Sequence, residues 1–305
     1  MNNIEDILFK SRAIFFHFVN ECNKRYRSGD DLEYYQTIIQ THRKINNIET
    51  ILEAESFLNK VRDTLVKWNM DDRAADLQSI EVISKNILTH KRILKDLYVF
   101  KLHKINSFTN SEGQDIMAKI KFVFKKLNVM SSKRQTVGVS KTMHFLLPDL
   151  IPPVDGKYTL NFFYGNNQYS GEIEKEYETF KDIMIRFHHI TRTLNLSDSD
   201  IDDEKWNTSV PKLIDNAIIG FSKEFEEFLD NFQDEGIENF IKSVSNIASI
   251  DNYLLREYLE KRKNSYLNAK RKKIKEIIMR RKAREAGIKV SEEEIDDYLN
   301  KNKKI

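Results

Sequence analysis

Apolar side chains recur at helical spacing along most of this chain. In residues 173–194 a large apolar residue returns every three or four positions, and the same spacing continues through residues 214–232 and 237–258. Side chains three and four positions apart lie on the same face of an α-helix, so each segment would present one apolar face to a core. No alternation of apolar and polar residues is long enough to require a sheet. The pattern predicts a mainly α-helical protein.

Capping residues and breakers mark the predicted ends of the helices. We expect one helix over residues 4–28, one that begins at Asp30 or Asp31, one over 54–68 and a long helical stretch over 73–104. Only 9 Gly and 4 Pro occur among the 305 residues, which is too few for the many tight turns of a β-sandwich or barrel. The chain is therefore expected to form a multi-helix globular body.

The composition supports a sizeable core. Hydrophobic residues make up 40% of the chain and include 19 Phe and 12 Tyr, which is enough apolar surface for one large domain or two ordinary ones. We expect Trp68 and Met70 to belong to this core. The single cysteine, Cys22, excludes an internal disulfide and a multi-cysteine zinc site. We predict no metal site and no cofactor.

The N-terminal residues bear on localisation. The chain begins MNNIEDILFK, with acidic and polar residues where a signal peptide carries basic ones. The apolar run over residues 13–19 is interrupted by His17 and is far shorter than the roughly 20 residues that cross a bilayer. A lone cysteine is typical of a reducing compartment. Together these features predict a soluble, cytoplasmic protein without a membrane partner.

Charge is distributed unevenly along the chain. The formal net charge is only +3, but residues 256–305 hold 17 Lys and Arg against 9 Asp and Glu. We therefore predict a helical globular domain over residues 1–235 and a basic helical extension over residues 236–305. The extension would end in a short helical hairpin, because Ser291 and Glu294 form a capping box that starts a last helix.

The basic helix has two interpretations. Its cations could neutralise the phosphates of DNA or RNA, with the release of counterions as the driving force. They could instead recruit an acidic protein partner, or pack on the more acidic body of the same chain. The candidate nucleic-acid-binding residues are Lys261, Arg262, Lys270, Arg271, Lys272, Lys273, Arg280 and Arg281.

Three of the four prolines fall in one segment, beside side chains that are able to react. The segment SKTMHFLLPDLIPPVDGKYT spans residues 140–159 and contains Lys141, His144 and Asp155. Ser140 is expected to cap a short helix that carries Lys141 and His144 on one face and ends at the first proline. The two following prolines hold the chain extended, which would fix Asp155 relative to that helix.

The same segment carries a resemblance to a family. Together with LVKWNMDDRAADL before it and WNTSVPKLIDNAIIGF after it, SKTMHFLLPDLIPPVDGKYTLNFFYG resembles a family of uncharacterised archaeal and bacterial proteins with an SKxxHxLxPDLxPPxD core. The likeness covers about residues 50–222 and leaves the basic C-terminal part outside it. The family brings no established activity, so the resemblance implies a domain boundary and no chemistry.

A shorter stretch is similar to helix-hairpin-helix DNA glycosylases. In those enzymes a hairpin turn, an apolar helix and a Val-Asp dipeptide present a lysine and an aspartate, and GVSKT at residues 138–142 followed by PVD at residues 153–155 has the same order. The resemblance implies that Lys141 attacks the sugar C1′ of an extruded nucleotide while Asp155 assists and stabilises charge. Ser140 stands where those enzymes have a second hairpin glycine.

Two hypotheses for function follow. In the first, the chain is a nucleic-acid-binding protein and a DNA glycosylase-like enzyme whose catalytic residues are Lys141, His144 and Asp155. Lys141 and Asp155 would then face a common cleft bordered by the basic helix. In the second, it is a non-enzymatic helical interaction protein, in which the three side chains form a polar knot and the basic helix points away towards an acidic partner. Ligand binding without chemistry is a third interpretation of the trio, and the charge distribution favours the first hypothesis.

Overall fold

The part of the chain described in this computed structural model is built from fourteen α-helices. The structure describes residues 4–26, 29–68, 70, 77–165, 170–202, 205–232 and 235–285, and for residues 55, 269 and 272–285 it describes the backbone alone. Within these ranges β-type pairing is limited to two isolated bridges. The predicted mainly α fold is confirmed.

The helices differ widely in length, from four residues to 34. No described helix is both long enough and apolar enough to cross a membrane. Two 3-10 segments and one π-helical turn lie between them: η1 (Leu102–Lys104), η3 (Asp198–Asp200) and η2 (Gly156–Leu160). In chain order the α-helices are α1 (Ile4–Leu8), α2 (Arg12–Arg25), α3 (Asp30–Ile45), α4 (Ile48–Glu53), α5 (Glu55–Lys67), α6 (Ile80–Thr89), α7 (Lys91–Tyr98), α8 (Ser111–Leu127), α9 (Thr136–Leu146), α10 (Asn161–Tyr164), α11 (Ile173–Thr193), α12 (Val210–Phe232), α13 (Gly236–Ile247) and α14 (Asn252–Glu285).

Two of the predicted helical stretches are divided in the structure. The helix expected over residues 4–28 is α1 followed by α2, and the stretch expected over 73–104 contains α6 and α7, which meet at His90. Nδ1 of His90 donates to the carbonyl oxygen of Asn86 at 2.6 Å. That carbonyl would accept from the His90 amide in a continuous helix, and the amide bonds to Ile87 instead. The side chain thus competes with the helical hydrogen bond and interrupts the helix.

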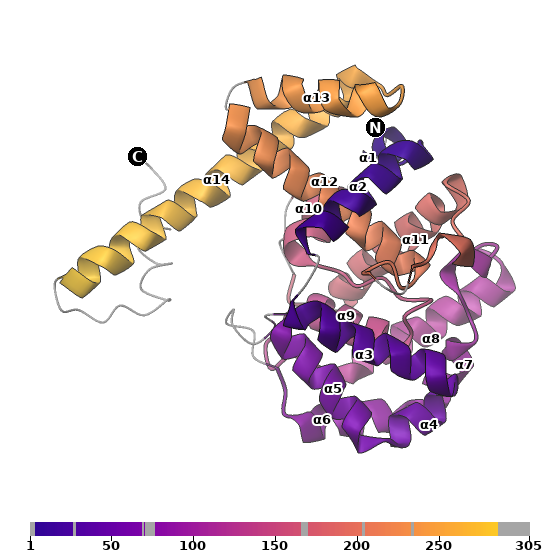
Figure 1. The fold of residues 1–305 in the computed structure, drawn as a ribbon. Helices are drawn as coiled ribbons and strands as arrows, with labels where there is room; N and C mark the ends of the chain where they lie inside the picture. Colours follow the sequence, from indigo (N-terminus) through magenta and orange to yellow (C-terminus); the bar gives the residue numbers. More distant parts are fainter. Residues whose placement is uncertain are drawn as a thin grey trace.

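Two groups of helices meet to form the body. Figure 1 shows α3 to α9 together in one group and α1, α2, α12 and α13 together in the other. α11 contacts α8 of the first group and α12 of the second. In the second group α2 lies along α12, and Gly220 permits this close contact because a Cβ atom there would overlap the carbonyl oxygen of Phe18. One continuous cluster of buried side chains runs through both groups.

This buried cluster extends past the predicted division between globular domain and basic extension. The ring of Phe240 in α13 packs on the rings of Phe18 and Phe221. In α14, Leu255 and Leu259 are fully buried. The first turns of the basic helix therefore belong to the body, and the remainder of α14 projects from it (Figure 1).

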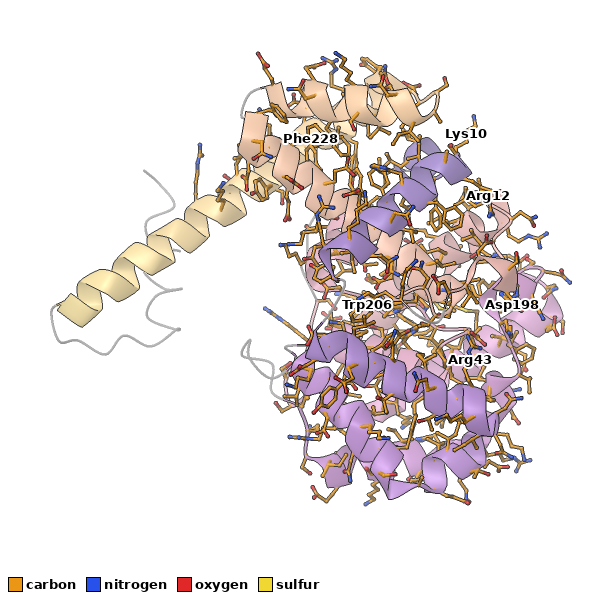
Figure 2. All side chains as sticks on the ribbon, in the orientation of Figure 1. Lys10, Arg12, Arg43, Asp198, Trp206 and Phe228 are labelled. Atoms are coloured by element: carbon orange, nitrogen blue, oxygen red, sulfur yellow. The ribbon has the colours of Figure 1, made fainter. Side chains whose placement is uncertain are left out.

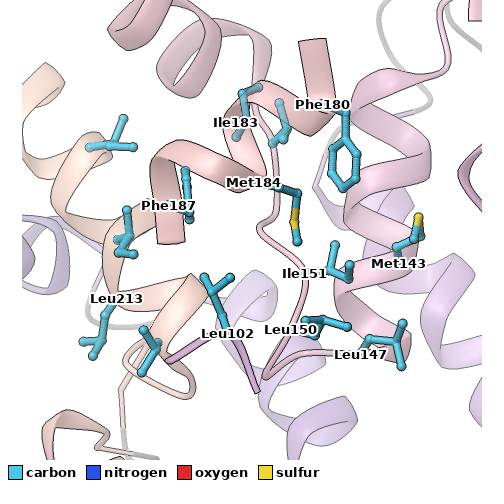
Figure 3. Close-up of a cluster of buried hydrophobic side chains, with 14 of the residues drawn as sticks. Leu102, Met143, Leu147, Leu150, Ile151, Phe180, Ile183, Met184, Phe187 and Leu213 are labelled. Carbon is cyan, nitrogen blue, oxygen red and sulfur yellow. The ribbon is translucent and has the colours of Figure 1, made fainter. Parts of the chain in front are cut away.

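The proline segment is held in place by apolar packing. Figure 3 shows apolar side chains of this segment, of α9 and of α11 gathered in one buried cluster, so the segment lies in the core between helices from different parts of the chain. Nearly all residues of α9 are buried, so this helix has little freedom to shift. The side chains drawn there include Met143, Leu147, Leu150, Ile151, Phe180, Met184 and Phe187.

Ser140 has a different role from the predicted one. It does not cap a helix, because α9 begins four residues earlier at Thr136. Its Oγ donates to the carbonyl oxygen of Val137 at 3.1 Å and accepts from the amide of Val154 at 3.2 Å. Ser140 therefore ties α9 to the far end of the proline segment, directly before Asp155.

Candidate functional site

A cavity of about 460 Å³ lies where the two groups of helices meet. Its walls come from α2, the start of α3, the chain after α5, α9, the end of the proline segment and the first half of α12. Figure 2 shows one lining residue, Trp206, at this junction. The volume is within the range of sites that hold small ligands.

Lys141 of α9 and Asp155 at the end of the proline segment meet in the wall of this cavity. Nζ of Lys141 lies 3.2 Å from Oδ2 of Asp155 and 3.8 Å from Sδ of Met70. The ammonium also lies 5.4 Å from the ring centroid of Trp68, which is a cation–π distance. The side chain of Lys141 is 8% exposed and that of Asp155 is 29% exposed. The pair therefore reaches solvent through its carboxylate.

Asp155 also caps the helical turn that follows it. Its Oδ1 accepts hydrogen bonds from the amides of Lys157 at 2.8 Å and Tyr158 at 3.2 Å. Burial acts to raise the pKa of Asp155, but the charge of Lys141 and the hydrogen bonds from Lys141 and the two amides outweigh it. The pKa of Asp155 is consequently lowered below the ordinary value of 3.8. Asp155 is held as a carboxylate.

His144 lies on the same helix, but both of its ring nitrogens are engaged elsewhere. Nδ1 lies 2.7 Å from the carbonyl oxygen of Ile151, which can only accept, so Nδ1 carries the proton. Nε2 then accepts from the hydroxyl of Tyr35 at 2.8 Å. Burial lowers the pKa of His144 to about 3. This neutral, fully buried ring anchors the proline segment, and neither nitrogen is left for Lys141 or Asp155.

A second Lys–Asp pair lines the same cavity, and our sequence reasoning missed it. Nζ of Lys212 donates to Oδ2 of Asp215 at 2.6 Å and to Oδ1 of Asn216 at 2.8 Å. The same ammonium lies 5.1 Å from the ring centroid of Trp206 and 5.9 Å from that of Trp68. The signal that could have found the pair is a lysine and an aspartate three positions apart in the largely apolar start of α12.

A hydrogen-bond network of asparagine side chains supports this second pair. Oδ1 of Asn207 accepts from Nδ2 of Asn216 at 2.9 Å and from Nδ2 of Asn23 at 2.9 Å. Asn23 belongs to α2 and Asn216 to α12. The network therefore crosses between the two helices and fixes the orientation of Asn216, which in turn accepts from Lys212.

The two aspartates differ in the partners of their second oxygen. Oδ1 of Asp215 is buried and has no hydrogen-bond partner among the described residues. Burial raises the pKa of Asp215 above the ordinary value of 3.8, although the charge and the hydrogen bond of Lys212 act in the opposite direction. Nε1 of Trp68, also in the cavity wall, is likewise buried and unpartnered in the described part of the chain.

Aromatic rings form the apolar part of the wall. Trp68 and Trp206 are in contact, with ring centroids 6.0 Å apart. Behind them, Tyr35 stacks on Trp206 at 5.4 Å with an interplanar angle of 17°. Trp68 and Met70, which were expected in the core, pack against it and also line the cavity. The cavity thus combines planar apolar surfaces with two ion pairs.

The basic helix stands apart from the cavity. No α14 residue with a described side chain lines the cavity. Arg262 is directed at the body, where it donates to Oγ of Ser222 at 2.8 Å and lies 5.4 Å from the ring centroid of Phe221. Lys270 pairs with Asp230 of α12 at 2.6 Å. These two candidate residues therefore dock the helix onto its own chain.

The remaining candidate cations of the basic helix face solvent or lie outside the description. Lys261 pairs with Glu257 one turn away at 2.8 Å, with a side chain that is 64% exposed. Arg271 is exposed. The predicted hairpin at Ser291 and Glu294 lies outside the described residues. The side chains of four candidates also lie outside them: Lys272, Lys273, Arg280 and Arg281.

The geometry bears on both hypotheses. Lys141 and Asp155 line one cavity, as the enzyme hypothesis expects, while the described part of α14 does not border it, as the interaction hypothesis expects. No family model, curated protein or solved structure matches this chain. What the site does must follow from its own residues and their arrangement.

Proposed function

We propose that this protein binds nucleic acid and is a DNA glycosylase-like enzyme, in which the cavity holds an extruded nucleotide and Lys141 with Asp155 performs the chemistry. The observation that carries the proposal is the 3.2 Å contact between Nζ of Lys141 and Oδ2 of Asp155 in the wall of a cavity of about 460 Å³. A lysine amine is a recognised nucleophile in covalent catalysis.

The walls of the cavity support a nucleotide as the occupant. Trp68 and Trp206 provide planar rings, and stacking of a base on an aromatic side chain contributes about 1–3 kcal/mol. Arg134 and Lys157 also line the cavity, and the side chain of Lys157 is 45% exposed. Cations at that position suit the phosphates on either side of an extruded nucleotide.

The proposed reaction starts from the ammonium form of Lys141. Its proton passes to the departing base, directly or through water, and the freed lone pair forms a bond to C1′ of the sugar. The bond between C1′ and the base breaks, and its electron pair leaves with the base. Opening of the sugar ring then gives an imine on Lys141, which water hydrolyses to restore the amine. The carboxylate of Asp155 stabilises the positive charge that develops at C1′.

Borohydride trapping of the imine tests this proposal. The full-length protein is incubated with duplexes that contain uracil, hypoxanthine or an alkylated purine, and covalent complexes are measured on a denaturing gel. We expect trapping by the wild type, none by Lys141→Gln, and a fall of about 100-fold or more for Asp155→Asn. Lys101→Gln is the matched control, because Lys101 also pairs with an aspartate, Asp198 at 3.0 Å, but does not line the cavity. Trapping that persists in Lys141→Gln, or is absent in the wild type, contradicts the proposal.

Nucleic-acid binding is tested separately by fluorescence anisotropy across a salt series. Truncation of α14 would remove the buried Leu255 and Leu259, so we use the exposed pair Lys261→Gln and Arg271→Gln in the full chain. If the cavity side of the body is the main binding surface, the double variant still binds duplex DNA. The slope of log K against log salt then falls by about 0.9 for each phosphate contact that is lost.

A second candidate function is favoured by the direction of α14. The helix projects from the body in Figure 1, and no α14 residue with a described side chain lines the cavity. This arrangement suits a non-enzymatic interaction protein that recruits an acidic partner. Polyglutamate is a suitable probe. The interaction function expects binding that weakens in the Lys261→Gln and Arg271→Gln double variant, together with no borohydride trapping on any duplex.

A further inference from the structure

Two residues in the wall of one cavity each carry a buried polar atom that has no hydrogen-bond partner in the described part of the chain. Oδ1 of Asp215 is an acceptor when the side chain is ionised, and Nε1 of Trp68 carries a hydrogen that it can only donate. Buried polar atoms in folded proteins almost always have a partner. An acceptor and a donor that both lack one among the described residues, on two side chains that line the same cavity, indicate a ligand that supplies the complementary groups.

We propose that Asp215 and Trp68 recognise the polar edge of a nucleobase, in which a hydrogen-bond donor stands beside an acceptor. Oδ1 of Asp215 would accept from a ring or exocyclic N–H, and Nε1–H of Trp68 would donate to the neighbouring oxygen or nitrogen. This inference rests on the proposed function, because the extruded nucleotide is what brings a base into the cavity.

The contacts of Asp215 leave one oxygen for a ligand. Lys212 occupies Oδ2 at 2.6 Å and is itself held by Asn216 at 2.8 Å, so the position of Asp215 is set by its neighbours on α12. The terminal torsion of an aspartate side chain is soft. Rotation about this torsion can turn Oδ1 towards a ligand without any change in the backbone or in the contacts among Asn23, Asn207 and Asn216.

Trp68 connects the recognition end of the cavity to the reactive end. Its ring centroid lies 5.4 Å from Nζ of Lys141 and 5.9 Å from Nζ of Lys212. The indole ring therefore lies within cation–π distance of both ammonium groups. A nucleoside whose base edge meets Asp215 could place its sugar near Lys141, which is what attack at C1′ requires.

The two tryptophans give a direct measurement of binding. The chain contains two tryptophans, Trp68 and Trp206, and both line the cavity, so quenching of intrinsic fluorescence reports its occupation. The probes are uridine and adenosine at millimolar concentration, each compared with an analogue whose N–H is blocked: 3-methyluridine and N6,N6-dimethyladenosine. For at least one pair we expect the blocked form to bind about 10- to 100-fold more weakly to the wild type.

Asp215→Asn sharpens the test. The asparagine keeps an oxygen for Lys212 and turns an N–H towards the ligand, so we expect it to weaken the parent nucleoside about 10- to 100-fold and to leave the blocked form almost unchanged. Trp68→Phe should weaken the parent as well, with Trp206 as the remaining reporter. Asp31→Asn is the matched control, because Asp31 also lines the cavity and its side chain is exposed.

The outcomes separate this inference from the proposed function. Any of three results would overturn recognition by Asp215. The parent and blocked nucleosides could bind equally well in both pairs, or neither parent could quench the fluorescence. Asp215→Asn and Asp31→Asn could also lose the same amount of affinity for the parent nucleoside. The comparison of nucleosides needs the wild type alone, so it holds even if a variant fails to fold. Failure of the proposed function is recognised differently, by the absence of Lys141-dependent trapping on DNA while nucleoside binding through Asp215 persists.

Discussion

Lys141 and Asp155 come from two segments joined by the proline-rich chain, whereas Lys212 and Asp215 come from one turn of α12. In the first pair the side chain of Asp155 is 29% exposed and its second oxygen accepts from two amides. In the second pair both side chains are at most 5% exposed and the second oxygen of Asp215 has no described partner. The pKa of Asp155 is lowered and that of Asp215 is raised.

The comparison shows that a neighbouring lysine is not enough to set the direction in which the pKa of an aspartate shifts. Each carboxylate has a lysine within hydrogen-bonding distance, yet the pKa shifts are opposite because only Asp155 has further donors to offset its burial. Asp155 is therefore suited to remain a charged carboxylate beside Lys141. Asp215 is suited to form a hydrogen bond with a ligand or to transfer a proton. Three comparisons between variants test how far this contrast holds.

The largest effect is expected from Lys212→Met. This change leaves the carboxylate of Asp215 buried without its charged partner, so the free energy of unfolding should fall by about 3–5 kcal/mol. Lys141→Met should cost no more than about 2 kcal/mol, because Asp155 retains solvent and both capping amides. Urea denaturation measures both values. The double variant Lys212→Met with Asp215→Leu should recover most of the loss, and equal costs for the two lysines would contradict the contrast.

A smaller effect is expected from Ser140→Ala, which acts on the first pair alone. The change removes the acceptor of the buried Val154 amide and should lower the free energy of unfolding by about 1–3 kcal/mol. It should also loosen Asp155 relative to Lys141 and reduce trapping on DNA, while nucleoside binding at Asp215 stays close to that of the wild type. Thr142→Val is the control, since Thr142 bonds only within α9, to the carbonyl of Gly138. Similar losses of trapping in both variants would show that Ser140 has no special positioning role.

The smallest effect is a difference in pH dependence between Asp155→Asn and Asp215→Asn. The folded-state pKa of Asp155 lies below 3.8, so its contribution to stability is complete above that pH and is lost as the pH falls through the folded value. The pKa of Asp215 is raised, so its contribution is complete below 3.8 and is lost as the pH rises through the folded value.

Urea unfolding between about pH 3 and about pH 6 distinguishes the two variants. Asp155→Asn should reduce the loss of stability on acidification, and Asp215→Asn should remove a loss that develops as the pH rises. Each variant changes the slope by at most about 1.4 kcal/mol per pH unit, the limit for one proton. Slopes that change in the same direction in both variants would show that the two aspartates have similar environments.

Much of the fold could be predicted because helical periodicity is a local property. The amphipathic stripe over residues 173–194 is α11, and the one over 214–232 lies in α12. The division at His90 could not be read in the same way, because the ring nitrogen and the backbone amide compete for one carbonyl. The prediction that Ser140 caps a helix was wrong. Its partner Val154 is fourteen residues away and comes within reach only when the proline segment folds back.

Only part of the candidate site could be predicted from the sequence, for the same reason. Lys141 and Asp155 could be connected from the sequence, because few residues separate them and three prolines restrict the path between them. His144 was grouped with them by its spacing, but the packing of Tyr35 and Ile151 around its ring assigns it to the core. Nothing local marks which distant helix will supply that tyrosine.

The amino-acid sequence by itself determined that this protein is helical, which faces of its helices are apolar, and that a stiff segment carries a lysine and an aspartate. The tertiary structure alone decided that Lys212 and Asp215 share a cavity with them and that the Trp68 ring lies within 6 Å of both ammonium groups. Side-chain periodicity predicts that one face of a helix will be buried. Which other segment covers that face depends on the packing of parts far apart in the chain.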